Sequence, residues 1–282
     1  MSRTKKWIIA GVIMIFAGAL ISTGAFAYSG FNLNMLGTAS YVTNTYEADE
    51  EFKNIRIEED AGGIVFALSD DDKVKVECIE LEKAPHDVSV KNGTLYIKEA
   101  SVRMSPWEIG FPMGKIRTTI LLPEKEYEEL SIESDLGSID IPKDFIFRNI
   151  KIDHDAGGLK CLASVKEDIH INTDVGKTEL EGLTCKNLIV GSDTGAISLT
   201  DVKASGRFDL KTDVGSITFD ACDAEEIKAE TATGSIEGTF LSDKVFSAKT
   251  DTGRVDVPDT REGGRCELAT DTGSISIKIV KK

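Results

Sequence analysis

The sequence predicts an all-β fold: a single-stack β-solenoid, parallel β-helix-like, with rungs of 19 or 20 residues and an N-terminal transmembrane helix. Three observations lead to this prediction: a recurring motif, an alternation of hydrophobic and polar residues around it, and an uncharged stretch near the amino end. The motif is Thr/Ser-Asp-x-Gly, and its glycine returns every 19 or 20 residues. We expect structural turns at these glycines: Gly137, Gly157, Gly176, Gly195, Gly215, Gly234, Gly253 and Gly273.

Hydrophobic residues alternate with polar ones on both sides of each motif. In the unit around Gly215, Phe208 and Leu210 precede the glycine, and Ile217 and Phe219 follow it. A period of two residues is typical of β-strands, and no helical pattern interrupts the units. Because a unit of about 20 residues is too short for a propeller blade or a pair of helices, the repeat indicates stacked β rungs.

The repeated aspartates have two interpretations. In the first, each carboxylate accepts the backbone N–H of the glycine in an Asx turn, and the hydroxyl residues before the aspartates form a ladder under the corner. In the second, the carboxylates bind a column of calcium ions. The turn is favoured, because Ala232 replaces the aspartate in one unit and because the glycines of calcium-binding nonapeptide rolls precede the aspartate. In the calcium interpretation the column comprises Asp135, Asp155, Asp174, Asp193, Asp213, Asp251 and Asp271.

Composition and motifs argue against several classes of function. A net charge of −15 argues against nucleic-acid binding and against adhesion to an anionic membrane surface. The three histidines show no Cys/His spacing typical of zinc sites, and no nucleophile elbow, phosphate loop or zincin motif occurs. The sequence therefore predicts no catalytic residue, no cofactor and, apart from the calcium alternative, no metal. The five cysteines share no repeat position, which favours buried thiols over disulfides between neighbouring rungs.

The amino end predicts a membrane anchor. Residues 7–27 carry no charge and are long enough as a helix to span a bilayer, so they are expected to form a transmembrane signal-anchor. Arg3, Lys5 and Lys6 place residues 1–6 in the cytoplasm as a short tail and the rest of the chain outside. Ala25-Phe26-Ala27 also has the small-x-small pattern of a signal-peptide cleavage site, so removal of the segment remains the alternative.

The remaining chain divides into three parts. Residues 28–45 read as a linker, 46–122 as an N-terminal β section that caps the solenoid, and 123–282 as the repeats. Within the cap, a loop contains Trp107, Phe111 and Met113, which either cover the end of the core or contact a membrane or partner. The sequence does not decide whether the last rung is left open; if it is, Lys278, Lys281 and Lys282 would guard its edge against strand-to-strand association.

Several segments resemble a known bacterial family. They are the opening YEADEEFKNIRIEEDAGGI, the hairpin VSVKNGTLYIKE, and the TD-x-G rungs that reach LSDKVFSAKTDTGRVDVP. Together they are similar to the β-strand-repeat family often called "putative adhesin", which has no agreed activity and includes LiaG-like envelope proteins. The resemblance covers about residues 1–282. It implies a membrane-anchored, extracytoplasmic β-solenoid of Gram-positive type, linked in some members to envelope stress, and it brings no catalytic residues. Many members have Gly-Asp after the corner, whereas this chain usually has Gly-Ser.

The sequence favours a non-enzymatic scaffold or interaction module at the cell envelope. It would be a single-pass protein of the cell membrane, anchored through residues 7–27, with a cytoplasmic N-terminus and an extracellular C-terminal domain. Its expected partner is an envelope protein or a glycan, and not nucleic acid. Two alternatives stay open: a surface adhesin that binds glycan or protein, and a glycan-active β-helix enzyme, which the missing site constellation disfavours.

Overall fold

The computed structural model describes residues 40–100 and 116–281, together with a few helical residues near the amino end (14, 18, 21–24 and 27–28). No helix within these described residues is long and apolar enough to cross a membrane. Most of the predicted anchor 7–27 lies outside the described residues, as do Trp107, Phe111, Met113 and Lys282.

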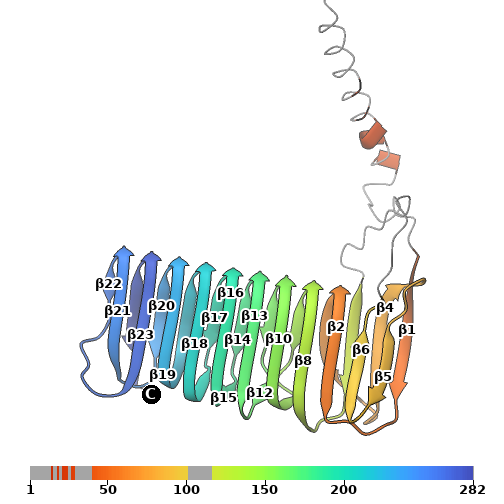
Figure 1. Cartoon of the computed structure of the whole chain (residues 1–282), viewed down its shortest axis with the longest axis horizontal. Helices are drawn as coiled ribbons and strands as arrows, with labels where there is room; N and C mark the ends of the chain where they lie inside the picture. The colour runs from red at the N-terminus through yellow and green to blue at the C-terminus, as the bar shows by residue number, and fades with distance from the viewer. Residues whose placement is uncertain are drawn as a thin grey trace, which may run out of the picture.

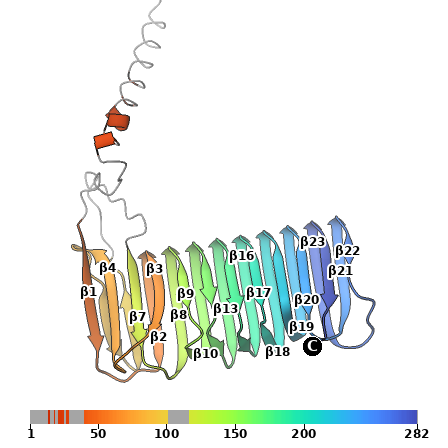
Figure 2. The same ribbon diagram turned by 180° about the vertical axis from the view of Figure 1, so that it is seen from behind.

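Apart from these few helical residues the described chain is all-β, as predicted, and its strands form a long stack of rungs in two layers (Figures 1 and 2). In spatial order, one layer contains β5 (Asp87–Lys91), β6 (Thr94–Lys98), β2 (Asn54–Ala61), β8 (Glu126–Leu136), β10 (Ile146–Ala156), β13 (Asp168–Val175), β16 (Asn187–Thr194), β18 (Lys203–Val214), β19 (Ile217–Thr233), β23 (Gly264–Thr272) and β21 (Lys244–Thr252). The other contains β1 (Tyr41–Ala48), β4 (Val74–Leu81), β7 (Arg117–Leu122), β3 (Gly63–Leu68), β9 (Ile139–Ile141), β11 (Leu159–Cys161), β14 (Thr178–Glu181), β17 (Ile197–Thr200), β19 again, β20 (Ile236–Phe240), β24 (Ile275–Ile279) and β22 (Val255–Asp256). Each rung turns at two corners: the first is at the repeated glycines, and the second is where the chain returns to the first layer. Two short strands, β12 (Ser164–Val165) and β15 (Thr184–Cys185), lie at the second corner.

The core lies between the two layers because the rungs stack in register. Leu188 pairs with Phe208, and Ile197 pairs with Ile217, so the inward residues of successive rungs cover one another. Phe208 and Phe219 face each other across the core with ring centroids 6.4 Å apart, and both are buried. Each rung therefore shields the hydrophobic side of its neighbours, as expected for a solenoid. The five cysteines are buried and free, which confirms the prediction of unpaired thiols.

The amino end of the stack has an irregular cap. Strands β1, β4 and β7 pair antiparallel, and β5 and β6 form the predicted hairpin, with φ of 51° at Asn92 and 73° at Gly93. Positive φ at both turn residues is what a two-residue hairpin loop requires. Strand β1 begins at Tyr41, so the prediction of a linker through residue 45 was wrong at its end, because β4 pairs with these residues.

The carboxyl end departs from the expected order of rungs. Strands β23 and β24, the last in sequence, lie between the rung of β19 and β20 and the rung of β21 and β22. Figure 1 shows β23 between β20 and β21. The sequence left open whether the last rung is exposed, and the structure shows that it is covered: β24 is paired on both sides, and Lys281 forms an ion pair with Asp243 at 2.7 Å.

The composition of the two rungs explains this order. The inserted rung buries Cys266, Leu268, Ile275 and Ile277, whereas Val255 in the outermost rung is 42% exposed. Strand β22 has only two residues, and a proline follows shortly after it. A short, less hydrophobic edge suits the end of a stack, since it leaves little apolar surface and few unpaired backbone groups for association. The more hydrophobic rung is thus covered on both sides.

Hydrogen exchange should report this order directly. We expect amides of β21 and β22 to exchange faster than those of β23 and β24, because the former pair with one neighbour only among the described strands. Peptide-resolved exchange followed by mass spectrometry measures both rungs in one experiment. Slower exchange in β21 and β22 than in β23 and β24 would indicate that the rungs stack in sequence order instead.

Candidate functional site

The predicted turn glycines form the first corner of the rungs, and their stacking leaves no room for a side chain. A Cβ added to Gly157 would lie 1.5 Å from the carbonyl oxygen of Gly137, and one on Gly176 would lie 1.7 Å from that of Gly157. The Gly157 N–H donates to the carbonyl of Val175 in the next rung at 2.9 Å. The Asx-turn interpretation was therefore wrong in its acceptor, because the rungs approach closely enough for backbone pairing at the corner.

The hydroxyl residues before the aspartates also bond differently from the predicted ladder. Four of the hydroxyls donate to the carbonyl of a corner glycine in a neighbouring rung, among them Thr212 to Gly195 at 3.0 Å and Thr231 to Gly215 at 2.9 Å. Thr250 and Thr270 make equivalent bonds to Gly273 and Gly234. The buried hydroxyls of Ser134, Thr173 and Ser192 have no hydrogen-bond partner among the described residues. The bonds from threonine satisfy glycine carbonyls at the corner, so these four threonines stabilise their turns from inside.

Removing one of these hydroxyls should have a modest cost. We expect Thr231→Val to lower the free energy of unfolding by about 1 kcal/mol, because it deletes a buried hydrogen bond and keeps the shape of the side chain. Thr233→Val, at an exposed position of the same motif, is the matched control and should change little. Urea unfolding followed by circular dichroism compares the two. Equal effects would show that the hydroxyl bond contributes nothing.

The predicted aspartate column lies on the exposed side of this corner. Asp135, Asp155, Asp174, Asp193, Asp213, Asp251 and Asp271 are all exposed, and Asp251 forms an ion pair with Lys249 at 3.3 Å. Solvent can therefore screen the repulsion between neighbouring carboxylates. Calcium binding by this column stays a prediction, which a calcium titration of the melting temperature tests.

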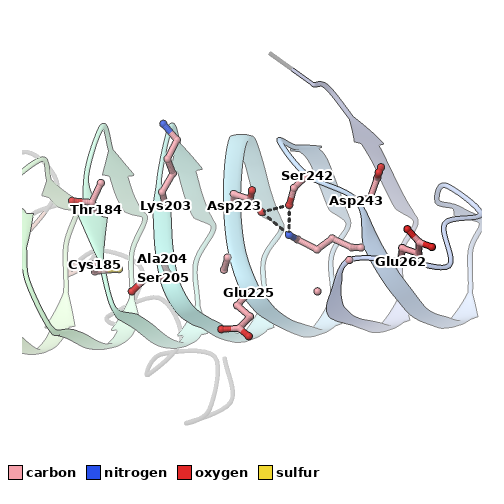
Figure 3. A pocket seen from close by; sticks show the side chains of 14 residues that line it. Thr184, Cys185, Lys203, Ala204, Ser205, Asp223, Glu225, Ser242, Asp243 and Glu262 are labelled. Atoms are coloured by element: carbon pink, nitrogen blue, oxygen red, sulfur yellow. Dashed lines mark hydrogen bonds and ion pairs between the residues drawn. The ribbon is translucent and has the colours of Figure 1, made fainter.

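A groove of about 740 Å³ follows the second corner across several rungs (Figure 3). Its lining includes Lys203, Ser205, Asp223, Ser242 and Lys244. The Lys244 side chain is 3% exposed and donates to the Asp223 carboxylate and to the Ser242 hydroxyl, both at 2.6 Å. Because β23 separates β21 from β19, this side chain reaches past the inserted rung and joins the rungs on either side of it.

A cluster of charged and polar side chains is buried inside the amino-terminal cap. Glu59 at the end of β2, Glu80 on β4 and His86 in the following turn are 2%, 1% and 4% exposed. One imidazole nitrogen, Nδ1, contacts the Glu80 carboxylate, and the other, Nε2, lies 3.1 Å from Glu59 Oε2. Thr118 on β7 donates to Glu59 at 3.2 Å. The cluster therefore joins three strands of the cap through polar contacts only.

Charge is retained in this buried cluster. Burial alone would lower the pKa of His86, but its contacts with Cys78 and Glu59 outweigh burial and raise that pKa to about 11. Burial acts against the charged form of Glu80, yet the donors Asn44, His86 and Tyr46 together lower the pKa of this carboxyl group. The structure therefore supports an imidazolium held between carboxylates.

Sequence reasoning missed this cluster, although the signal was present. Ile55 and Ile57 point into the core, and the same alternation points Glu59 inward; Val74, Val76 and Cys78 likewise lead to Glu80. A charged residue at an inward strand position requires a partner. The predicted corner aspartates do not belong to this cluster: they are exposed, whereas Glu59, Glu80 and His86 are buried.

The stack, the cap and the corner glycines define a β-solenoid protein in which each rung contacts its neighbours. Residues 52–282 match the model of the Toastrack DUF4097 family, so this chain belongs to that family. The comparison with curated proteins gives no match.

Two solved structures illustrate the fold. A "putative adhesin" from Bacteroides fragilis is 20% identical, with a TM-score of 0.50 over 85% of this chain and 97% of its own. A "putative lipid binding protein" from Parabacteroides distasonis is 17% identical, with a TM-score of 0.51 over 86% of this chain and 98% of its own. At such identities the likeness concerns the fold alone.

Proposed function

We propose that this protein is a membrane-anchored, extracytoplasmic interaction module that presents the rigid face of its stack to a partner in the bacterial cell envelope. The observation that carries this proposal is the unbroken run of ten parallel strands from β6 to β21, roughly 43 Å long at about 4.8 Å per strand. Such a run offers a partner a long surface whose side chains repeat at fixed spacing.

The outward side chains of this layer are polar and braced. Lys151 pairs with Asp153 at 3.1 Å, Asn172 donates to Asp153 at 2.9 Å, and Lys228 pairs with Glu230 at 3.2 Å. These contacts order the surface in advance, which lowers the entropic cost of binding. Two proteins of the same fold are called a "putative adhesin" and a "putative lipid binding protein", and these names favour an interaction role over catalysis.

The anchor is the second part of the proposal. The uncharged segment 7–27 and the basic residues before it support insertion with the stack outside the membrane. The resemblance to LiaG-like envelope proteins further supports a link to the envelope-stress response. A C-terminal epitope on the full chain should be digested by protease added to spheroplasts, and the protein should resist carbonate extraction. A protected epitope or an extractable protein would contradict the anchor, and the mass of the mature protein reveals cleavage after Ala27.

Site-specific crosslinking in cells tests the interaction. A photoreactive residue at Lys151 or Lys228, on the layer that contains β10 and β19, should capture a defined envelope protein or glycan. The matched control positions are Lys160 and Glu237, which are exposed on the opposite layer. The proposal expects capture from one layer and not from the other. No capture, or the same products from both layers, would overturn it.

The groove at the second corner favours a second candidate, an adhesin that binds a glycan. Its mixture of Lys203, Ser205 and Asp223 supplies donors and acceptors for sugar hydroxyls. If this is its role, a glycan array probed with the full chain should give hits that Ser205→Trp abolishes, because this exposed residue lines the groove. An array without hits, together with unchanged cell attachment after gene deletion, would remove this candidate.

A further inference from the structure

The buried cluster of the cap contains a thiol that the ion pairs do not explain. Cys78, Glu80 and His86 each offer one potential ligand atom, and these three atoms lie within 4.8 Å of one another. All three residues are buried, with exposed fractions of 0%, 1% and 4%. An imidazolium between Glu80 and Glu59 accounts for the carboxylates, and the Cys78 thiol contacts the same imidazole and accepts a hydrogen bond from Thr118 at 3.9 Å. The thiol adds a third ligand of a different chemical kind.

We propose that Cys78, Glu80 and His86 form a binding site for one divalent transition-metal ion of the zinc class, located inside the amino-terminal cap. Thiolate, imidazole and carboxylate are the donors that structural and catalytic zinc sites combine, while calcium and magnesium prefer oxygen alone. In a tetrahedral site with bonds of about 2.0–2.3 Å, neighbouring ligand atoms are about 3.5 Å apart. Ligand atoms within 4.8 Å need only small side-chain movements to reach that arrangement.

The surrounding residues hold these ligands as the outer shell of a metal site does. Glu59 lies 3.1 Å from Nε2 of His86 and can accept its N–H, which leaves Nδ1, the nitrogen beside Glu80, to bind the metal. Tyr46 donates to Glu80 at 2.8 Å, and the backbone N–H of His86 donates to it at 2.7 Å. These bonds fix the direction of the carboxylate before any ion binds.

The position of the site indicates its role. Its ligands come from β4 and the turn after it, and the supporting groups come from β1, β2 and β7. A bound ion would therefore tie the irregular cap to the first regular rung. Binding deprotonates the thiol and the imidazolium, so it releases protons, and it stabilises the folded chain because the unfolded chain has no formed site.

Cobalt provides a probe that reports the thiolate itself. The full chain, purified in detergent and stripped with a chelator, should bind one Co²⁺ with a near-ultraviolet thiolate-to-cobalt band, and Zn²⁺ should displace it. Cys78→Ser should abolish the band, and His86→Gln should weaken binding by roughly 100-fold or more, since even outer-shell losses cost 10–100-fold. Cys161→Ser is the matched control, because that thiol is equally buried and lies in the repeats. It should leave the band unchanged.

Two measurements on the unaltered chain keep the test independent of variant folding. Zn²⁺ should raise the melting temperature, and it should protect Cys78 from alkylation after partial unfolding more than it protects Cys161. No cobalt band and no shift in melting temperature would overturn the proposal. A band that persists in Cys78→Ser, or one that Cys161→Ser abolishes equally, would also overturn it.

Discussion

Gly157→Ala is expected to lower the free energy of unfolding by at least about 3 kcal/mol. Gly157 has a φ of +146°, where an L side chain is strained, and its added Cβ would lie 1.5 Å from the Gly137 carbonyl oxygen. Backbone strain of this kind costs about 1–3 kcal/mol, and forced overpacking costs about as much again. Because the clash is with backbone, relief requires separation of two rungs at their corner. Urea unfolding of the full chain, followed by circular dichroism, measures the effect.

The next residue offers a matched control. A Cβ added to Gly158 would meet no atom within 4 Å, and this glycine is exposed. Gly158→Ala should therefore stay within about 0.5 kcal/mol of the unaltered protein. If the two substitutions had the same effect, the corner glycines would owe their presence to flexibility and not to the close approach of the rungs.

Glu80→Gln should be the most disruptive polar substitution in the cap, with a loss of about 3–5 kcal/mol when the chain is measured in the presence of a chelator. The carboxylate accepts bonds from Asn44, Tyr46 and both the backbone and the ring of His86. Glutamine keeps the shape but removes the charge that faces the imidazolium, and its amide adds a donor where donors already converge. The same unfolding experiment measures the loss.

The control lies on the same strand. Glu77 is on β4 with its side chain exposed, so Glu77→Gln makes the same chemical change outside the core. We expect it to change the free energy of unfolding by less than about 0.5 kcal/mol. A small loss for Glu80→Gln, comparable with that of Glu77→Gln, would mean that the buried charge is not needed for the stability of the cap.

The repeat could be predicted from the sequence because its signals are local. The spacing of Gly137 and its equivalents, and the alternation around them, place the strands and their inward residues without knowledge of any distant contact. The function of the threonines could not be predicted in the same way. Thr231 donates to the carbonyl of Gly215 in the neighbouring rung. Whether a hydroxyl reaches a carbonyl or another hydroxyl depends on how the corners of two neighbouring rungs are positioned relative to each other, which the sequence does not give.

The buried cluster could be predicted only in part. Inward positions for Glu59 and Glu80 follow from strand alternation, and each requires a buried partner. That the partner is His86 depends on how the turn after β4 folds back over β2 and β7, and neither strand is close to His86 in sequence. A search for charged residues at inward strand positions would have found the carboxylates but not the histidine.

What the sequence by itself determined is the architecture of the rungs: two strands per repeat, a glycine corner, and a continuous core. Only the tertiary structure decided the order of rungs at the two ends. At one end β2 pairs with β8, and at the other β23, from the last rung in sequence, lies between β19 and β21. The physical reason is that every rung has compatible edges, so periodicity alone permits several orders. Coverage of the most hydrophobic rungs, which depends on residues distant in sequence, selects among them.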